Sequence, residues 1–181
     1  MNGDLAREAL KNFLKGTQRV AVVGIGQRYR YDDAAGIAVV ENLYQRLSGS
    51  EVLPLSLSDT QFETAAGSVR LFQGYETPES LTGSLRKFFP THVIFVDAAQ
   101  LDRNPGTIEV VPTSDIQGEE LSTHNLPLSI LGEFLEKDLG CKVVLLGIQP
   151  FSIELTSEGS LSEPVQKAVV LAVEILEDVL K

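Results

Sequence analysis

Cysteine is nearly missing from this sequence of 181 residues, which contains only one, Cys141. No disulfide can form within one chain, so nothing ties the protein to an oxidising compartment. A lone cysteine could serve as a protease nucleophile. Cys141 stands at the amino end of a predicted strand, however, and we interpret it as a small buried apolar residue.

Basic residues are also scarce, with 15 Lys and Arg against 25 Asp and Glu and a formal net charge of -10. This balance argues against binding to nucleic acid and against adsorption to anionic lipid. No apolar run approaches the length of about 20 residues that spans a bilayer, and residues 1–16 lack the apolar core of a signal peptide. We therefore expect a cytoplasmic protein without membrane insertion, with cations and proteins left as partners.

Several catalytic and nucleotide-binding motifs are absent. Gly24-Ile25-Gly26 opens like a dinucleotide fingerprint, but Tyr29 stands where the third glycine belongs. The sequence has no phosphate loop ending in Gly-Lys-Ser/Thr, no Gly-x-Ser-x-Gly nucleophile elbow and no His-Glu-x-x-His zinc motif. These absences disfavour nucleotide binding, serine hydrolase chemistry and a thermolysin-type zinc site.

The sequence does contain enough apolar residues, 43%, to build a sizeable core. The segments 20–23, 92–96 and 142–146, which are apolar except for His92 and Lys142, are typical of central parallel strands, and segments with helical periodicity alternate with them. This alternation predicts an α/β fold: a single-domain three-layer α/β/α architecture with a twisted, mostly parallel sheet of about five strands flanked by helices.

The domain is expected to cover residues 1–181. Residues 1–16 form an additional N-terminal helix in this prediction, and residues 51–68 are predicted to be an insertion. Within that insertion, residues 51–57 could form a short strand.

In a parallel α/β sheet, ligands bind outside the carboxyl ends of the strands. That rule selects Asp33, which opens a predicted helix, and Asp97, which ends a buried strand. His124, in the loop Ser-Thr-His-Asn-Leu-Pro, completes a set of two carboxylates and an imidazole that suits a divalent metal. Each residue also has a structural alternative. The acids could cap a helix or hold a turn, and His124 could cap a helix or face solvent.

Electrostatics favours a cation if the two acids converge. Two ionised carboxylates about 4 Å apart repel by roughly 4 kcal/mol at an effective dielectric of 20, and a divalent ion relieves that repulsion. Arg28 and Arg30 lie beside the acids in the sequence, so a cation site requires that both point outward. His92, at the start of a strand, is interpreted as structural.

Five segments together carry a resemblance to a known family. They are GIGQRYRYDDAAG, TPES, HVIFVDAAQLDRNPGTI, STHNLPL and VVLLGIQP, in this order. The sequence resembles the hydrogenase maturation endopeptidases, the C-terminal processing proteases of [NiFe]-hydrogenase large subunits, and is most similar to the formate-hydrogenlyase-type branch. The resemblance covers roughly residues 19–181.

The resemblance implies a function as a nickel-dependent endopeptidase, a hydrolase acting on a peptide bond of a [NiFe]-hydrogenase large-subunit precursor. The implied metal-contacting and catalytic residues are Asp33, Asp97 and His124. The nickel is supplied by the substrate and serves as the recognition element, so the isolated enzyme is expected to be metal-free. Further substrate contacts are predicted at Gly26, Gln27, Thr123 and Gln149. The alternative is a non-cleaving hydrogenase assembly factor of the same fold. Its support is the altered loop 27–31, in which Gln27 stands where the family usually has Asn, and Tyr31 where it commonly has Gly before the paired acids.

Overall fold

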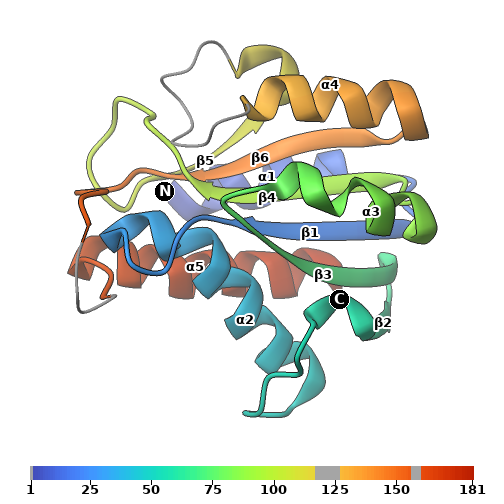
Figure 1. The fold of residues 1–181 in the computed structure, drawn as a ribbon, viewed down its shortest axis with the longest axis horizontal. Coiled ribbons are helices and arrows are strands. Elements are labelled where there is room, and N and C mark those ends of the chain that lie inside the picture. The colour runs from blue at the N-terminus through green and yellow to red at the C-terminus, as the bar shows by residue number, and fades with distance from the viewer. Residues whose placement is uncertain (1, 117–126, 156–159) are drawn as a thin grey trace.

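The computed structural model describes residues 2–116, 127–155 and 160–181, and Figure 1 shows its arrangement. A six-stranded sheet runs through the centre in the order β2-β3-β1-β4-β6-β5. The inner strands β3, β1, β4 and β6 are parallel, whereas the edge strands β2 and β5 are antiparallel to their neighbours. The strands are β1 (Arg19–Ile25), β2 (Gln61–Thr64), β3 (Gly67–Tyr75), β4 (His92–Ala98), β5 (Ile108–Pro112) and β6 (Lys142–Ile148).

Helices cover both faces of this sheet, which confirms the predicted three-layer α/β/α fold (Figure 1). One face packs against α1, α2 and α5, and the other against α3 and α4. The helices are α1 (Asn2–Phe13), α2 (Ala35–Ser48), α3 (Thr82–Phe88), α4 (Leu128–Leu139) and α5 (Glu163–Leu180). None of the helices in the described part of the chain is long and apolar enough to cross a membrane.

The apolar runs of the sequence correspond to strands buried on both faces. In β1, Val20 and Val22 belong to the core beneath α2 and α5, while Ala21 and Val23 belong to the core beneath α3 and α4. Successive side chains of a strand point to opposite faces, so a strand covered on both sides needs apolar residues at every position. The predicted central strands are therefore confirmed.

The segment predicted as an insertion differs from expectation in its detail. Residues 51–57 form no strand, so that part of the prediction is wrong. The strand lies later, at β2, which pairs with β3 as a short antiparallel edge. Its sequence, Gln-Phe-Glu-Thr, is half exposed and too short for a clear alternating pattern.

Close backbone contact brings the start of α2 against the sheet. A Cβ atom on Gly36 would lie 2.1 Å from the carbonyl oxygen of Val96 in β4 and 2.4 Å from that of Ile25 in β1. On Gly26, which has φ +130°, a Cβ would lie 1.7 Å from the carbonyl oxygen of Asp33. Only glycine fits at either position. These glycines therefore position the turn that carries Asp33 beside the ends of β1 and β4.

Replacement of Gly36 by alanine tests this contact. We expect Gly36→Ala to lower the free energy of unfolding by roughly 1–3 kcal/mol, because two backbone carbonyls must move to make room. The measurement is urea unfolding followed by circular dichroism.

Gly83 provides the matched control, because a Cβ there has no heavy atom within 4 Å and the residue lies exposed in α3. Gly83→Ala should stabilise the protein by about 0.5–1 kcal/mol. Equal effects of the two substitutions would contradict the close contact at Gly36.

Candidate active site

Asp33 sits in a buried turn between β1 and α2. The turn is a short 3-10 helix, η1 (Tyr31–Ala34). The Asp33 carboxylate oxygen Oδ2 accepts a hydrogen bond of 2.8 Å from the backbone N–H of Gln27. Neither η1 nor α2 has a side-chain cap hydrogen bond at its N-terminus, so Asp33 does not act as a helix cap here. The loop backbone instead fixes its carboxylate at the carboxyl edge of the sheet.

Asp32, the adjacent acid, has a different environment. Its Oδ2 accepts hydrogen bonds from the backbone N–H groups of Phe151 and Ser152, at 2.8 and 3.2 Å, and from the Ser162 hydroxyl at 2.8 Å. Its Oδ1 accepts one of 2.7 Å from the Ser162 backbone N–H. This buried carboxylate thus joins η1 to the chain before α5. Four donors occupy its acceptor capacity, so Asp32 is a structural residue.

Asp97 is the second predicted ligand at this edge. It is buried in β4, one residue before the end of the strand, and lies in register with Gly147 of β6. The turn η1 packs against β4, and Gly36 touches the carbonyl of Val96, the residue before Asp97. The structure therefore brings the elements that carry Asp33 and Asp97 together at one edge of the sheet.

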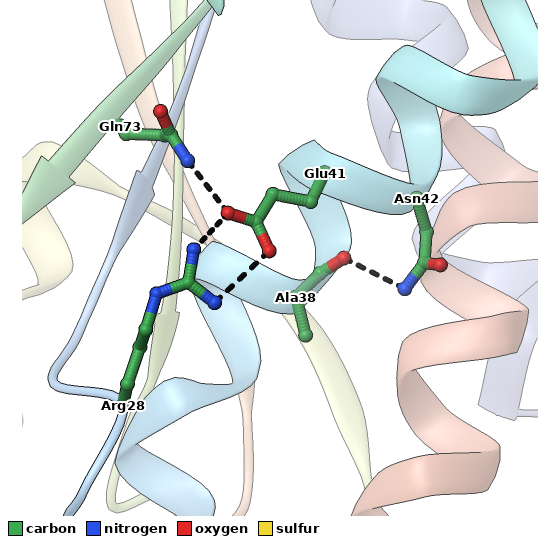
Figure 2. A network of polar contacts seen from close by, with 5 residues as sticks. All are labelled: Arg28, Ala38, Glu41, Asn42 and Gln73. Carbon is green, nitrogen blue, oxygen red and sulfur yellow. Dashed lines mark hydrogen bonds and ion pairs between the residues drawn. The ribbon is translucent and has the colours of Figure 1, made fainter. Parts of the chain in front are cut away.

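The arginines beside the acids contact other groups. The Arg28 guanidinium forms an ion pair with Glu41 of α2, and Gln73 of β3 donates a 2.6 Å hydrogen bond to the same carboxylate (Figure 2). The hydrogen bond from Arg28 to Glu41 raises the pKa of Arg28. Arg30 donates through Nε to the carbonyl of Ile153 at 3.3 Å. Arg28 is thus paired with an acid of α2, and Arg30 with a backbone carbonyl of the segment after β6.

His124 and Thr123 lie outside the described residues, so the imidazole of the predicted set is not placed. Across residues 2–116, 127–155 and 160–181, no group of three His, Cys, Asp or Glu side chains could hold a metal. The sequence has only two histidines, and the other, His92, starts β4 at the opposite edge of the sheet. Its Nδ1 contacts the Thr91 hydroxyl at 3.0 Å and its ring meets Phe13 edge-on. An imidazole at the acid edge must therefore come from His124.

Gln149, a predicted substrate contact, is buried and bonded to the neighbouring loop. Its Oε1 accepts hydrogen bonds from the backbone N–H groups of Leu101 and Arg103, at 2.7 and 3.3 Å. Its Nε2 donates to Gln100 and to the carbonyl of Pro150. Gln149 thus joins the loops that follow β4 and β6. Gln27 contributes its backbone N–H, rather than its side chain, to the contact with Asp33.

Cys141 is not part of this edge. It is buried immediately before β6, at the amino end of the strand, and burial raises the pKa of its thiol to about 11. A thiol with that pKa is protonated at neutral pH and is a poor nucleophile. This finding supports the interpretation of Cys141 as a core residue.

The contacts that sequence reasoning missed are those of Asp32 with Ser162 and of Arg28 with Glu41 and Gln73. Each joins residues distant in the chain and uses common surface residue types. No motif or spacing in the sequence marks either one.

Comparisons with known proteins agree with this architecture. The sequence model of a family described as HycI, hydrogenase maturation protease, matches residues 37–179. A protein of Methanocaldococcus jannaschii with a provisional name as a hydrogenase maturation protease is 32% identical over 95% of this chain and 96% of its own length. The hydrogenase 3 maturation protease of Escherichia coli is 36% identical over 46% of this chain and 54% of its own length.

A solved structure shows the same likeness in three dimensions. The [NiFe] hydrogenase maturation protease HycI from Thermococcus kodakarensis superposes with a TM-score of 0.75 at 30% identity, over 95% of this chain and 98% of the other. The endopeptidase HycI from Escherichia coli gives a TM-score of 0.67 at 26% identity, over 89% and 90%.

Substitution of Asp32 tests its structural role. We expect Asp32→Asn to lower the free energy of unfolding by about 3 kcal/mol, because an amide nitrogen would then face buried N–H donors. Ser162→Ala removes the hydroxyl donor alone and should cost about 1 kcal/mol. The measurement is chemical denaturation of both variants. If Asp32→Asn were no more destabilising than Ser162→Ala, the four-donor arrangement would be wrong.

Proposed function

The chain belongs to the HycI hydrogenase maturation protease family, and from this we infer its reaction and its substrate. We propose that it is the endopeptidase that removes the C-terminal extension of a nickel-loaded [NiFe]-hydrogenase large-subunit precursor. The observation that carries the proposal is the position of two buried carboxylates, Asp33 and Asp97, on neighbouring elements at the carboxyl edge of the sheet. Cytoplasmic action and the identity of the precursor remain predictions.

The substrate's nickel is the recognition element in this proposal. Asp33 and Asp97 supply carboxylate oxygens, and His124 supplies an imidazole nitrogen, which together suit a borderline divalent ion. Since the nickel arrives with the precursor, only a precursor that has already received its metal presents a complete ligand set. This arrangement couples cleavage to metal insertion without a resident metal in the protease.

The nickel also places the scissile bond. A metal beside the peptide polarises the scissile carbonyl or activates a water, a contribution of several kcal/mol to the barrier. A carboxylate oxygen that does not itself bind the metal accepts the proton of that water. Asp32 is unsuited to this role because its oxygens already accept four hydrogen bonds. We therefore assign proton acceptance to Asp33 or Asp97.

The altered loop 27–31 is compatible with cleavage. Its contact with Asp33 uses the backbone N–H of Gln27, so the side chain at this position does not decide the hydrogen bond. Arg28, which could have repelled the metal, is neutralised by Glu41. These contacts favour an active protease over the non-cleaving assembly factor of the same fold.

Processing assays test the site directly. Asp33→Asn, Asp97→Asn and His124→Gln should each lower cleavage of nickel-loaded precursor at least about 100-fold, because each removes a ligand of the recognised metal. Loss of the C-terminal extension is followed by mass spectrometry. Asp59→Asn, which alters an exposed acid on the 3-10 helix η2 (Leu57–Asp59), is the matched control and should cleave normally.

The same assay with nickel-free precursor tests metal recognition. Cleavage should require nickel-loaded precursor, and equal cleavage of the two forms would contradict recognition through the metal. Stable binding of the precursor by the wild-type protein without loss of mass would favour the assembly factor instead.

A further inference from the structure

Three exposed aromatic side chains stand at the carboxyl edge of the sheet. Tyr29 lies in the loop after β1, Tyr75 ends β3, and Phe151 lies in the loop after β6. Their exposed fractions are 63, 42 and 67%. The loops that follow β1, β4 and β6 gather on the left of Figure 1. Exposed aromatic residues beside a site are typical anchors of a protein interface.

Backbone hydrogen bonds attach these residues to the segment that carries the acids. The carbonyl of Tyr75 accepts a 3.0 Å hydrogen bond from the N–H of Gly26. The N–H of Phe151 donates to Asp32 at 2.8 Å. Tyr29 lies between these two attachment points in the same loop. The three aromatic residues therefore share one framework with Asp33.

The end of β3 is built irregularly where it carries Tyr75. Gly24 of β1 pairs with Gln73, but the next residue, Ile25, pairs with Tyr75, so Gly74 is bulged out of register. Tyr75 itself has φ +48°, a left-handed conformation that is uncommon for a bulky residue. Bulges near active sites re-aim side chains, and strained backbone gathers at ligand-binding positions. The bulge thus sets the direction of Tyr75 at this edge.

The other two exposed aromatic residues have a different setting. Phe89 and Phe134 each lie against an arginine, Arg19 and Arg86 respectively, with the guanidinium carbon 5.6 Å from the ring centre. Within the described residues, no such arginine or ring contact covers Tyr29 or Phe151. The hydroxyl of Tyr75 is hydrogen-bonded to Arg28, so Tyr75 also has an arginine neighbour. The exposed rings of Tyr29 and Phe151 cost hydrophobic free energy, which points to a partner at this edge.

We propose that Tyr29, Tyr75 and Phe151 form a docking surface for the processing region of the large-subunit precursor, where they bind apolar side chains that flank the scissile bond. This inference rests on the proposed function. The rings come from segments that are hydrogen-bonded to the turn carrying Asp33, so a polypeptide bound at Asp33 and Asp97 has these segments as neighbours. A second copy of this chain on the same surface would instead block access to the acids, which favours the precursor as occupant.

The test uses the full chain with all three rings replaced by asparagine, because asparagine tolerates the left-handed backbone of Tyr75. With nickel-loaded precursor, Tyr29→Asn/Tyr75→Asn/Phe151→Asn should raise KM about tenfold and leave kcat within roughly twofold, because docking energy is removed equally from bound substrate and transition state. The dissociation constant of the precursor, measured by calorimetry with Asp97→Asn as the non-cleaving background, should rise by the same factor.

Phe89→Asn is the matched control, because Phe89 is 53% exposed, also has a left-handed backbone with φ +53°, and follows α3 at the opposite edge. It should leave KM and the dissociation constant unchanged. Thermal unfolding of each variant checks folding, and the single variants Tyr29→Asn and Phe151→Asn replace the triple variant if its unfolding temperature falls.

The outcomes separate the two proposals. If the wild-type protein binds the precursor without cleaving it, the proposed protease function fails and the dissociation constants alone judge the docking surface. Normal cleavage with an unchanged KM and dissociation constant in the triple variant overturns the docking surface while the protease function stands. A change from dimer to monomer with unchanged KM, measured by light scattering, would also overturn it and assign the rings to contact between copies.

Discussion

Backbone contact at Gly26 and Gly36 sets how closely the acid-bearing turn approaches the sheet. A side chain at either glycine would meet a carbonyl oxygen at 1.7 or 2.1 Å. With hydrogen there instead, η1 can pack directly on β4. The contact brings together, at this edge of the sheet, the two elements that carry Asp33 and Asp97. The electrostatic and chemical properties of the acids depend on this geometric condition.

The adjacent acids have different roles: Asp32 is structural, and Asp33 is the one proposed to take part in the chemistry. Asp32 accepts four hydrogen bonds from Phe151, Ser152 and Ser162, in the segment between β6 and α5, and these bonds anchor η1 to that segment. Asp33 is held by the backbone of the loop 26–30, through Gln27. Arg28, in the same loop, forms an ion pair with Glu41 of α2, which neutralises the charge of Arg28 (Figure 2). The position of the Asp33 carboxylate therefore depends on the contacts of its neighbours Gln27, Arg28 and Asp32.

The sequence alone predicts most of the fold, because strong periodicity and buried apolar runs are local signals. Helical periodicity of this kind runs through α4 and α5, and local residues mark their ends: Gly140 caps the C-terminus of α4, and a proline stands in the first turn of α5. The placement of Asp33 and Asp97 follows from the strand-end rule. The roles of Asp32 and Arg28 could not be predicted, since Asp32 finds its partner Ser162 130 residues further along the chain. The bulge before Tyr75 likewise depends on pairing with β1.

The central claim is that Asp33 and Asp97 share one metal position at the edge of the sheet. The most direct measurement is a crystal structure of the protein soaked in excess nickel, with data collected at the nickel absorption edge. The account predicts an anomalous peak within coordination distance of carboxylate oxygens from both Asp33 and Asp97. A fully occupied nickel site elsewhere, with neither carboxylate in contact with metal, would contradict it.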